Sequence, residues 1–150
     1  MNIKVTNCTD ISLRKEIKKV SEFVMEYFFK GSKMLTNVCL NIKIDNNETK
    51  QNNAWGLCTW IDNRHKPRKF LIELSTEQTK KNFFLTLIHE LVHVKQYLTG
   101  EMKDYMSGEA KWKKTFYKKL ETVSDHTSLP WEKQAYKLSE KLYTFYFQDS

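Results

Sequence analysis

One segment of the chain combines residue types that could carry out chemistry together: His89-Glu90-Leu91-Val92-His93. The residues around it, from Leu87 to Val94, are mostly apolar and fit a buried helix. Residues four apart lie on the same face of a helix, so the imidazoles of His89 and His93 can reach one metal ion. Zinc binds imidazole well, and its catalytic sites use three protein ligands and leave one position for water.

Glu90 directly follows the first histidine and is rotated from it by roughly 100° around the helix. From there its carboxylate can reach a zinc-bound water without being a ligand, and can act as the general base. Zinc acidifies that water and polarises the carbonyl of the bond to be cleaved. A chance occurrence is the plain alternative, but two histidines and a glutamate in a buried helix need partners. The pattern therefore predicts a zinc-dependent peptidase, a hydrolase of peptide bonds with Glu90 as its catalytic residue.

The third zinc ligand stays open at this stage. Glu132 lies in the first turn of the last expected helix, where a carboxylate also has the structural role of complementing the helix dipole. His126 and Glu109 are the other candidates within reach along the chain. His65 lies in a basic turn and is expected to be exposed.

A second enzyme class, the peptide deformylases, uses the same histidine pattern with an upstream cysteine as third ligand. Cys58, in Gly56-Leu57-Cys58, raises this possibility, but the glycine-rich segment and the E-G-C-L-S-like stretch expected of that class are missing. The three cysteines, Cys8, Cys39 and Cys58, have no C-x-x-C spacing. Small buried side chains are therefore expected rather than disulfides or a four-cysteine zinc site.

The elements that must position these residues follow from hydrophobic periodicity. Helical spacing of apolar residues predicts a helix over 11–30, and alternation predicts strands over 37–45, 54–61 and 68–74. A polar loop is expected at 46–53 and a turn at 62–67, so the strands would pair most simply as an antiparallel meander.

The second half of the chain is expected to carry the site. Ser75 and Gln78 resemble a capping box for a long helix that runs to about Leu98 and ends at Gly100. Residues 108–117 fit a strand or an extended loop, and a last helix is expected over 131–147. The fold class is therefore α+β: one domain over 1–150, with an antiparallel-rich sheet packed against N-terminal, active-site and C-terminal helices.

Composition narrows the classes of protein. The chain has 150 residues, 40% of them hydrophobic and 29% charged, which is typical of a globular protein. No apolar run is long enough for a membrane span and no secretory signal is recognisable, so an intracellular, cytoplasmic location is expected.

The net charge of +7 includes one dense lysine cluster. Its members are Lys111, Lys113, Lys114, Lys118 and Lys119. No nucleic-acid-binding motif accompanies them, and a solvated face is the plain interpretation. The cluster nevertheless supports an alternative function, a non-catalytic basic module that contains zinc and binds protein or nucleic acid. The oligomeric state is open.

Three segments together, HELVHVKQ, GEAKW and PWEKQAY, resemble the small SprT-like metallopeptidases of phage and other viral genomes. The matching part runs from about Ala54 to Tyr136. The resemblance implies a minimal, zincin-like domain of the gluzincin type, with His89, His93 and Glu132 as ligands of Zn²⁺. Cellular SprT-like proteins commonly use a third histidine, which keeps His126 in consideration.

The family's geometry also implies an edge strand beside the cleft that pairs with an extended peptide or protein substrate. Either 54–61 or 68–74 could supply this strand. Tyr136 lies one turn after Glu132 and could donate a hydrogen bond to an oxyanion, although packing in the core is the simpler interpretation. A viral protein of this kind would act inside the host cell.

Overall fold

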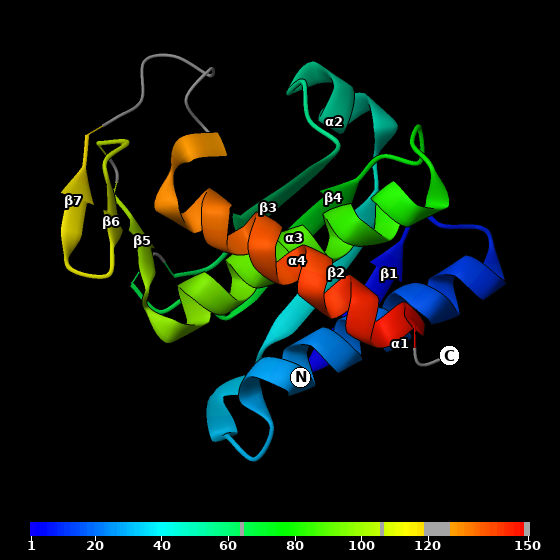
Figure 1. Ribbon diagram of the computed structural model, residues 1–150, viewed down its shortest axis with the longest axis horizontal. Helices are drawn as coiled ribbons and strands as arrows, with labels where there is room; N and C mark the ends of the chain where they lie inside the picture. The colour runs from blue at the N-terminus through cyan, green and yellow to red at the C-terminus, as the bar shows by residue number, and fades with distance from the viewer. Residues whose placement is uncertain (64, 106, 119–126, 149–150) are drawn as a thin grey trace.

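The computed structural model describes residues 1–63, 65–105, 107–118 and 127–148. Within these ranges, four α-helices and seven strands follow one another in a mixed order (Figure 1). They are β1 (Asn2–Thr6), α1 (Ile11–Phe29), β2 (Cys39–Ile44), α2 (Asn46–Gln51), β3 (Gly56–Trp60), β4 (Lys69–Leu74), α3 (Lys80–Thr99), β5 (Met102–Asp104), β6 (Ala110–Trp112), β7 (Thr115–Tyr117) and α4 (Pro130–Gln148). The α+β class expected from the sequence is confirmed. None of the described helices combines the length and apolarity that a bilayer crossing requires.

The main sheet has four strands in the order β1-β2-β4-β3. The first three run parallel to one another, and β3 pairs antiparallel with β4 at the edge. The expected meander is therefore wrong: the hairpin of β3 and β4 exists, but β2 pairs with β4 and not with β3. Burial explains this order, because β4 is largely buried and takes an interior place, while β3 is only partly buried.

Two segments of the main sheet region differ from the sequence-based expectation. The first strand, β1, was not predicted, and its Ile3 and Val5 pack against the core. The expected loop at 46–53 contains the short helix α2, whose N-cap is Asp45: the carboxylate accepts a hydrogen bond from the backbone N–H of Glu48.

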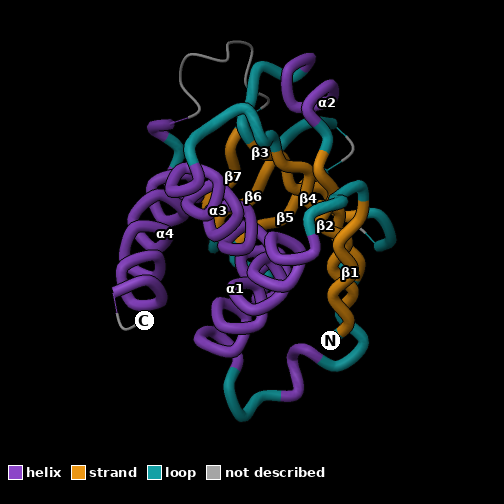
Figure 2. Tube along the Cα trace, turned by 90° about the vertical axis from the view of Figure 1, so that its right-hand side faces the viewer, coloured by secondary structure: helices purple, strands orange, loops and turns teal. Residues whose placement is uncertain are grey.

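The core lies between the main sheet and the helices on one of its faces. Figure 2 shows α1, α3 and α4 together on one side of the strands. Buried residues of α1 such as Val20, of α3 such as Leu87, and of β4 such as Ile72 belong to one apolar cluster. This packing fixes the rotation of α3, and hence the direction in which its histidines point.

The helix α3 begins later than expected. Thr79 is its N-cap and accepts a hydrogen bond from the backbone N–H of Asn82, whereas Ser75 accepts one from Glu77 in the preceding turn. The predicted capping box at Ser75 and Gln78 is therefore wrong. The predicted end is confirmed: Gly100 adopts the left-handed conformation, with φ 77°, that closes many helices.

A small second sheet of β5, β6 and β7 follows α3, and its strands pair antiparallel in that order. The expected strand or loop at 108–117 is thus a hairpin of two strands. Met102 of β5 and Trp112 of β6 form a second apolar cluster with Leu129 and Trp131 at the start of α4. This cluster anchors the start of α4, and so the position of Glu132.

Candidate metal centre and active-site cleft

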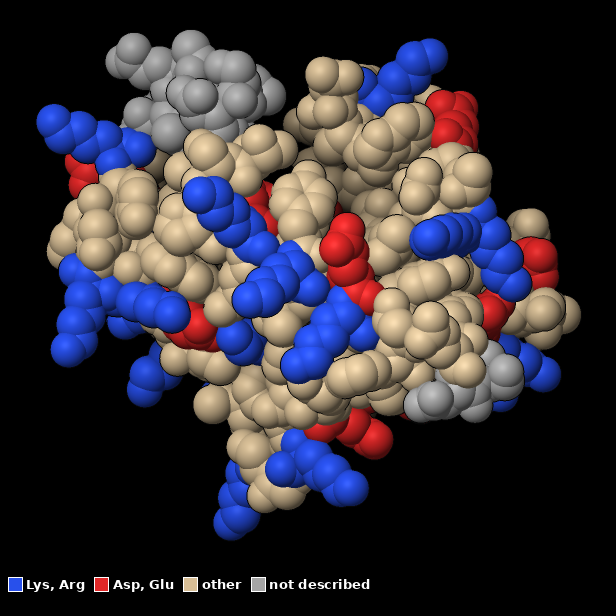
Figure 3. All heavy atoms as spheres, in the orientation of Figure 1, with Lys and Arg blue, Asp and Glu red and all other residues tan. Residues whose placement is uncertain are grey.

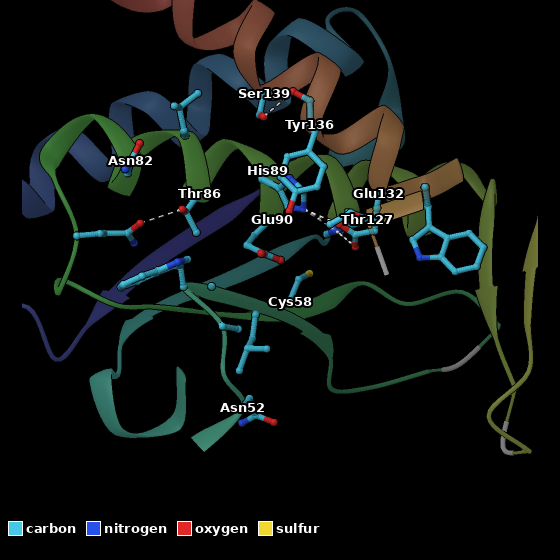
Figure 4. A pocket seen from close by; sticks show the side chains of 18 of the residues that line it. Asn52, Cys58, Asn82, Thr86, His89, Glu90, Thr127, Glu132, Tyr136 and Ser139 are labelled. Carbon is cyan, nitrogen blue, oxygen red and sulfur yellow. Dashed lines mark hydrogen bonds and ion pairs between the residues drawn. The ribbon is translucent and has the colours of Figure 1, made fainter. Parts of the chain in front are cut away.

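His89, His93 and Glu132 converge although α3 and α4 are far apart in the sequence. Figure 4 shows His89 of α3 and Glu132 of α4 close to each other. Nε2 of His89 lies 3.0 Å from Oε2 of Glu132, and Nε2 of His93 lies 3.0 Å from Oε1 of the same carboxylate. The two Nε2 atoms are 3.2 Å apart. The i, i+4 spacing on α3 and the first turn of α4 therefore bring the three expected ligands to one point.

These three side chains could hold a metal ion, since their ligand atoms all lie within 4.8 Å of one another. Zinc bonds of ~2.0–2.1 Å at tetrahedral angles place neighbouring donor atoms roughly 3.3–3.4 Å apart. The separations of 3.0 to 3.2 Å are close to that value. Two imidazole nitrogens and a carboxylate are also a donor set that zinc accepts, so the residues fit the ion that the sequence predicts.

The carboxyl group of Glu132 and the imidazole of His93 shift each other's pKa. Burial alone would raise the pKa of Glu132, but hydrogen bonds from His89 and His93 outweigh it and lower that pKa to about 2. Burial alone would lower the pKa of His93, but Glu132 and the charge of Glu90 raise it to about 9. The negative charge of Glu132 and the positive charge of a protonated His93 thus stabilise each other.

Glu90 lies beside the three possible ligands but outside their group, and it is buried. Burial raises the pKa of its carboxyl group most, the charges of His93 and His89 oppose this, and Glu132 adds to it. A raised pKa moves this carboxylate toward the range in which a general base works best at neutral pH. The structure therefore holds two carboxyl groups in different settings: Glu132 bonded to both histidines, and Glu90 buried beside them with a raised pKa.

The strand β3 passes very close to Glu90, and Gly56 makes this approach possible. A Cβ added at Gly56 would lie 2.5 Å from Cγ2 of Thr86 and 3.2 Å from Cγ of Glu90. Any larger residue would push β3 away from α3. The absence of a side chain at position 56 thus allows β3 to lie directly against Thr86 and Glu90 of α3.

The two histidines have different surroundings on their other ring nitrogen. Nδ1 of His93 lies 2.8 Å from Oε1 of Gln96, which is fully buried. Nδ1 of His89 is buried and has no hydrogen-bond partner among the described residues. The ring of His89 instead packs against the ring of Tyr136, with 4.4 Å between their centroids.

A cleft of about 960 Å³ surrounds these residues. Its lining comes from β3 and the preceding residues, from the exposed face of α3, and from the first turns of α4. Among the described residues that line it, none is Lys or Arg, although the chain carries a net charge of +7. The cleft is thus lined by apolar, amide, hydroxyl and carboxyl groups together with the two imidazoles and the thiol of Cys58.

The other candidates from the sequence lie elsewhere. Glu109 and His65 are exposed and do not belong to the ligand group. His126 lies outside the described residues. Cys58 lines the cleft but is not part of the group either, and burial, with the charges of Glu90 and Asp104, raises the pKa of its thiol.

Two residues of the site were missed or left open from the sequence. Gln96 was not singled out, although its position three residues after His93 places it on a neighbouring part of the same helix face. For Tyr136, the sequence left open packing in the core, support of the ligands from behind and a role toward an oxyanion; half of its surface is exposed, it lines the cleft, and its ring packs on His89 (Figure 4).

Comparison of the chain with protein-family models, with curated proteins and with solved structures finds no match.

Proposed function

We propose that this protein is a zinc-dependent peptidase of the SprT-like, zincin-like kind, with His89, His93 and Glu132 as the metal ligands. The observation that carries the proposal is the convergence of these three donors, with the separate, buried carboxylate of Glu90 beside them. A purely structural zinc site is usually closed by four protein ligands and needs no such base. The large cleft at the site provides room for a substrate.

Zinc bound at this site would polarise a peptide carbonyl and acidify a water molecule. Glu90 takes a proton from the attacking water, whose oxygen forms the new bond to the carbonyl carbon. It then delivers that proton to the amide nitrogen as the carbon–nitrogen bond breaks, so that the amine leaves neutral. Tyr136, at the rim of the cleft, is placed to donate a hydrogen bond to the carbonyl oxygen as negative charge develops on it.

The strand β3 is the part of the cleft suited to hold the substrate backbone. It pairs with β4 on one side, and no other described strand pairs with its free edge. An extended peptide can add to such an edge through backbone hydrogen bonds. The other strand considered from the sequence, 68–74, forms β4 and is flanked by β2 and β3, so it has no free edge.

The proposal is tested with the Glu90→Gln variant, which keeps the shape of the side chain but removes the base. We expect this variant to retain zinc and to lose about 10²–10⁴-fold in cleavage rate. Cleavage is measured by mass spectrometry on a digest-derived peptide mixture and on unfolded casein. Glu109→Gln, at an exposed position, is the matched control and is expected to cleave like the parent. Equal rates for Glu90→Gln and the parent would show that Glu90 is not the base.

A second candidate function, binding of single-stranded nucleic acid, is favoured by the outer face of the small sheet. Strand register places Lys103, Lys111 and Phe116 in one row, and the exposed ring of Phe116 lies 5.9 Å from that of Tyr105. Lys and Arg side chains gather at this end of the molecule in Figure 3. Lysines next to exposed aromatic rings are typical of surfaces on which bases stack.

This candidate is tested by titration of a fluorescent oligo-dT at two salt concentrations. We expect binding that weakens with salt and is lost in the double variant Lys111→Glu/Phe116→Ala. Oligo-dT binding in the absence of any peptidase activity would favour the non-catalytic function over the peptidase.

A further inference from the structure

The residue Gln96 lies behind the metal centre and contacts both helices that supply its ligands. Its side chain is fully buried, with an exposed fraction of 0%, and it is the residue three positions after His93 on α3. Burial of an amide is costly unless its donor and acceptor atoms are both satisfied. In Gln96 both the oxygen and the nitrogen of the amide have hydrogen-bond partners, so the side chain is held in one orientation.

The hydrogen bonds of Gln96 determine which way its amide points. Nε2 lies 2.9 Å from the backbone carbonyl oxygen of Trp131 and 3.0 Å from Oε1 of Gln134. A backbone carbonyl can only accept a hydrogen bond, so the group that faces it must be the NH₂ group. The acceptor Oε1 of Gln96 is therefore the atom that faces Nδ1 of His93, at 2.8 Å.

This orientation in turn determines which ring nitrogen of neutral His93 carries the hydrogen. Because Gln96 offers an acceptor, Nδ1 of His93 must carry a hydrogen and donate it. The lone pair of the neutral ring is then on Nε2, the atom that points at Glu132 and at Nε2 of His89. Only this tautomer can bind a metal ion at the point where the three donors converge.

The same side chain also holds the start of α4. The carbonyl of Trp131 directly precedes Glu132, and Gln134 follows it by two residues. Gln96 thus contacts residues on both sides of the third ligand. Gln134 is linked further to Glu101 and Lys95, which form an ion pair with 2.6 Å between Nζ and Oε1.

We propose that Gln96 is the positioning residue of the metal centre: it selects the metal-binding tautomer of His93 through the hydrogen bond that its Oε1 accepts from Nδ1. This inference rests on the proposed metal site. His89 provides the internal contrast, because its Nδ1 has no such partner among the described residues. Metal affinity should therefore depend on Gln96 even though no atom of Gln96 binds the metal, and loss of its hydrogen bond to His93 should weaken zinc binding about 10–100-fold.

The test compares Gln96→Met with Gln96→Glu. Methionine fills a similar volume without hydrogen bonds, whereas glutamate keeps an acceptor for His93 but places its second oxygen against the carbonyl of Trp131. Zinc is titrated into metal-free protein in competition with a chromogenic chelator. We expect the Met variant to lose about 10–100-fold in affinity. The Glu variant should stay within about fivefold of the parent in zinc affinity, even though its thermal stability falls.

Two further measurements separate positioning from simple packing. Gln134→Ala removes a partner of Gln96 without touching His93, and should lower zinc affinity much less than Gln96→Met does. In ¹⁵N-histidine-labelled parent protein, the Nδ1 proton of His93 should exchange slowly with solvent, and it should lose this protection in Gln96→Met. The spectrum of the parent tests the inference even if Gln96→Met fails to fold.

The outcomes distinguish this inference from the proposed function. If the parent binds zinc but Gln96→Met binds it equally well, or if Gln96→Glu loses as much as Gln96→Met, the positioning role is wrong and the peptidase proposal is untouched. A rapidly exchanging Nδ1 proton in the parent would also overturn it. If the parent binds no zinc, the proposed metal site itself fails, and the role of Gln96 toward a metal fails with it.

Discussion

The two walls of the cleft differ in what they present to it. The wall formed by α3 and α4 presents side chains: the possible metal ligands His89, His93 and Glu132, with the carboxyl group of Glu90, the proposed base, beside them. The opposite wall, formed by β3, presents an edge with which no other strand of the described residues pairs, and a glycine that allows close approach. Under the proposed function, the first wall would carry the chemistry and the second would hold an extended peptide.

The two walls also differ in the part of the sequence that determines their geometry. The helical wall depends on local spacing, since the i, i+4 pair is set by helix geometry alone. The strand wall depends on which strands pair, and pairing is decided by the burial of distant segments. Changes on the first wall should therefore abolish metal binding, whereas changes on the second should alter stability and leave the metal in place.

The largest effect is expected from Glu132→Ala on the helical wall. Removing one of three ligands should weaken zinc binding by more than the ~10–100-fold typical of residues behind the ligands. Zinc content is measured by mass spectrometry of the protein purified without added metal. Glu109→Ala is the matched control, and His126→Ala is expected to keep its zinc. Zinc retained in Glu132→Ala but lost in His126→Ala would show a three-histidine site instead.

On the strand wall, Gly56→Ala should lower the free energy of unfolding by about 1–3 kcal/mol, as overpacking does. The added methyl group would clash chiefly with Cγ2 of Thr86, at 2.5 Å. Thr86→Ser removes that carbon, so the double variant should recover much of the loss. Urea denaturation of the parent, both single variants and the double variant gives the coupling. If the changes in unfolding free energy of the two single variants simply add up in the double variant, the clash between position 56 and Thr86 is not the cause of the loss.

A smaller effect is expected where the two walls are joined. Asp104 of β5 accepts hydrogen bonds from the hydroxyl of Tyr97 on α3, at 2.6 Å, and from Nε1 of Trp60 on β3, at 3.2 Å. Burial and the charge of Asp104 raise the pKa of Tyr97 above its usual range, so the hydroxyl keeps its proton. Tyr97→Phe should therefore cost about 1 kcal/mol in urea denaturation at any pH from 6 to 9.

The control for this change is Tyr105→Phe, which alters an exposed hydroxyl. It should leave the free energy of unfolding within about 0.5 kcal/mol of the parent. A loss that appears only at the alkaline end of the range would mean that Tyr97 ionises there, contrary to its buried hydrogen bond.

Much of the helical wall could be predicted from the sequence. The pair His89 and His93 follows from spacing within one helix, and the helix itself follows from its apolar pattern and from Gly100 at its end. Glu132 was one of several open candidates, because no local rule says which later segment returns to α3. The anchor of its helix is the apolar cluster around Trp112 and Trp131, which forms only in the folded chain.

The strand wall and the residues behind the ligands were harder to predict. Alternation placed β2, β3 and β4 nearly correctly, but alternation says nothing about order, and the parallel pairing of β2 with β4 needs contacts between distant residues. β1 is short and only partly buried, so it left little pattern to find. Gln96 resembles any polar helix residue until α4 packs beside it and buries it.

The smallest effect on the metal is expected from Cys58→Ser, although Cys58 lies in the cleft on the strand wall. A cysteine binds zinc as the thiolate, and burial together with the charge of Glu90 raises the pKa of this thiol, which keeps it protonated at neutral pH. The thiol is also absent from the group of converging donors. Zinc affinity in the chelator competition should therefore stay within about twofold of the parent, as for a residue that neither binds nor orients the ion. If Cys58→Ser lost its zinc while Glu132→Ala kept it, the ligand would come from the strand wall, as in the deformylases. The division between a wall for chemistry and a wall for substrate would then be wrong.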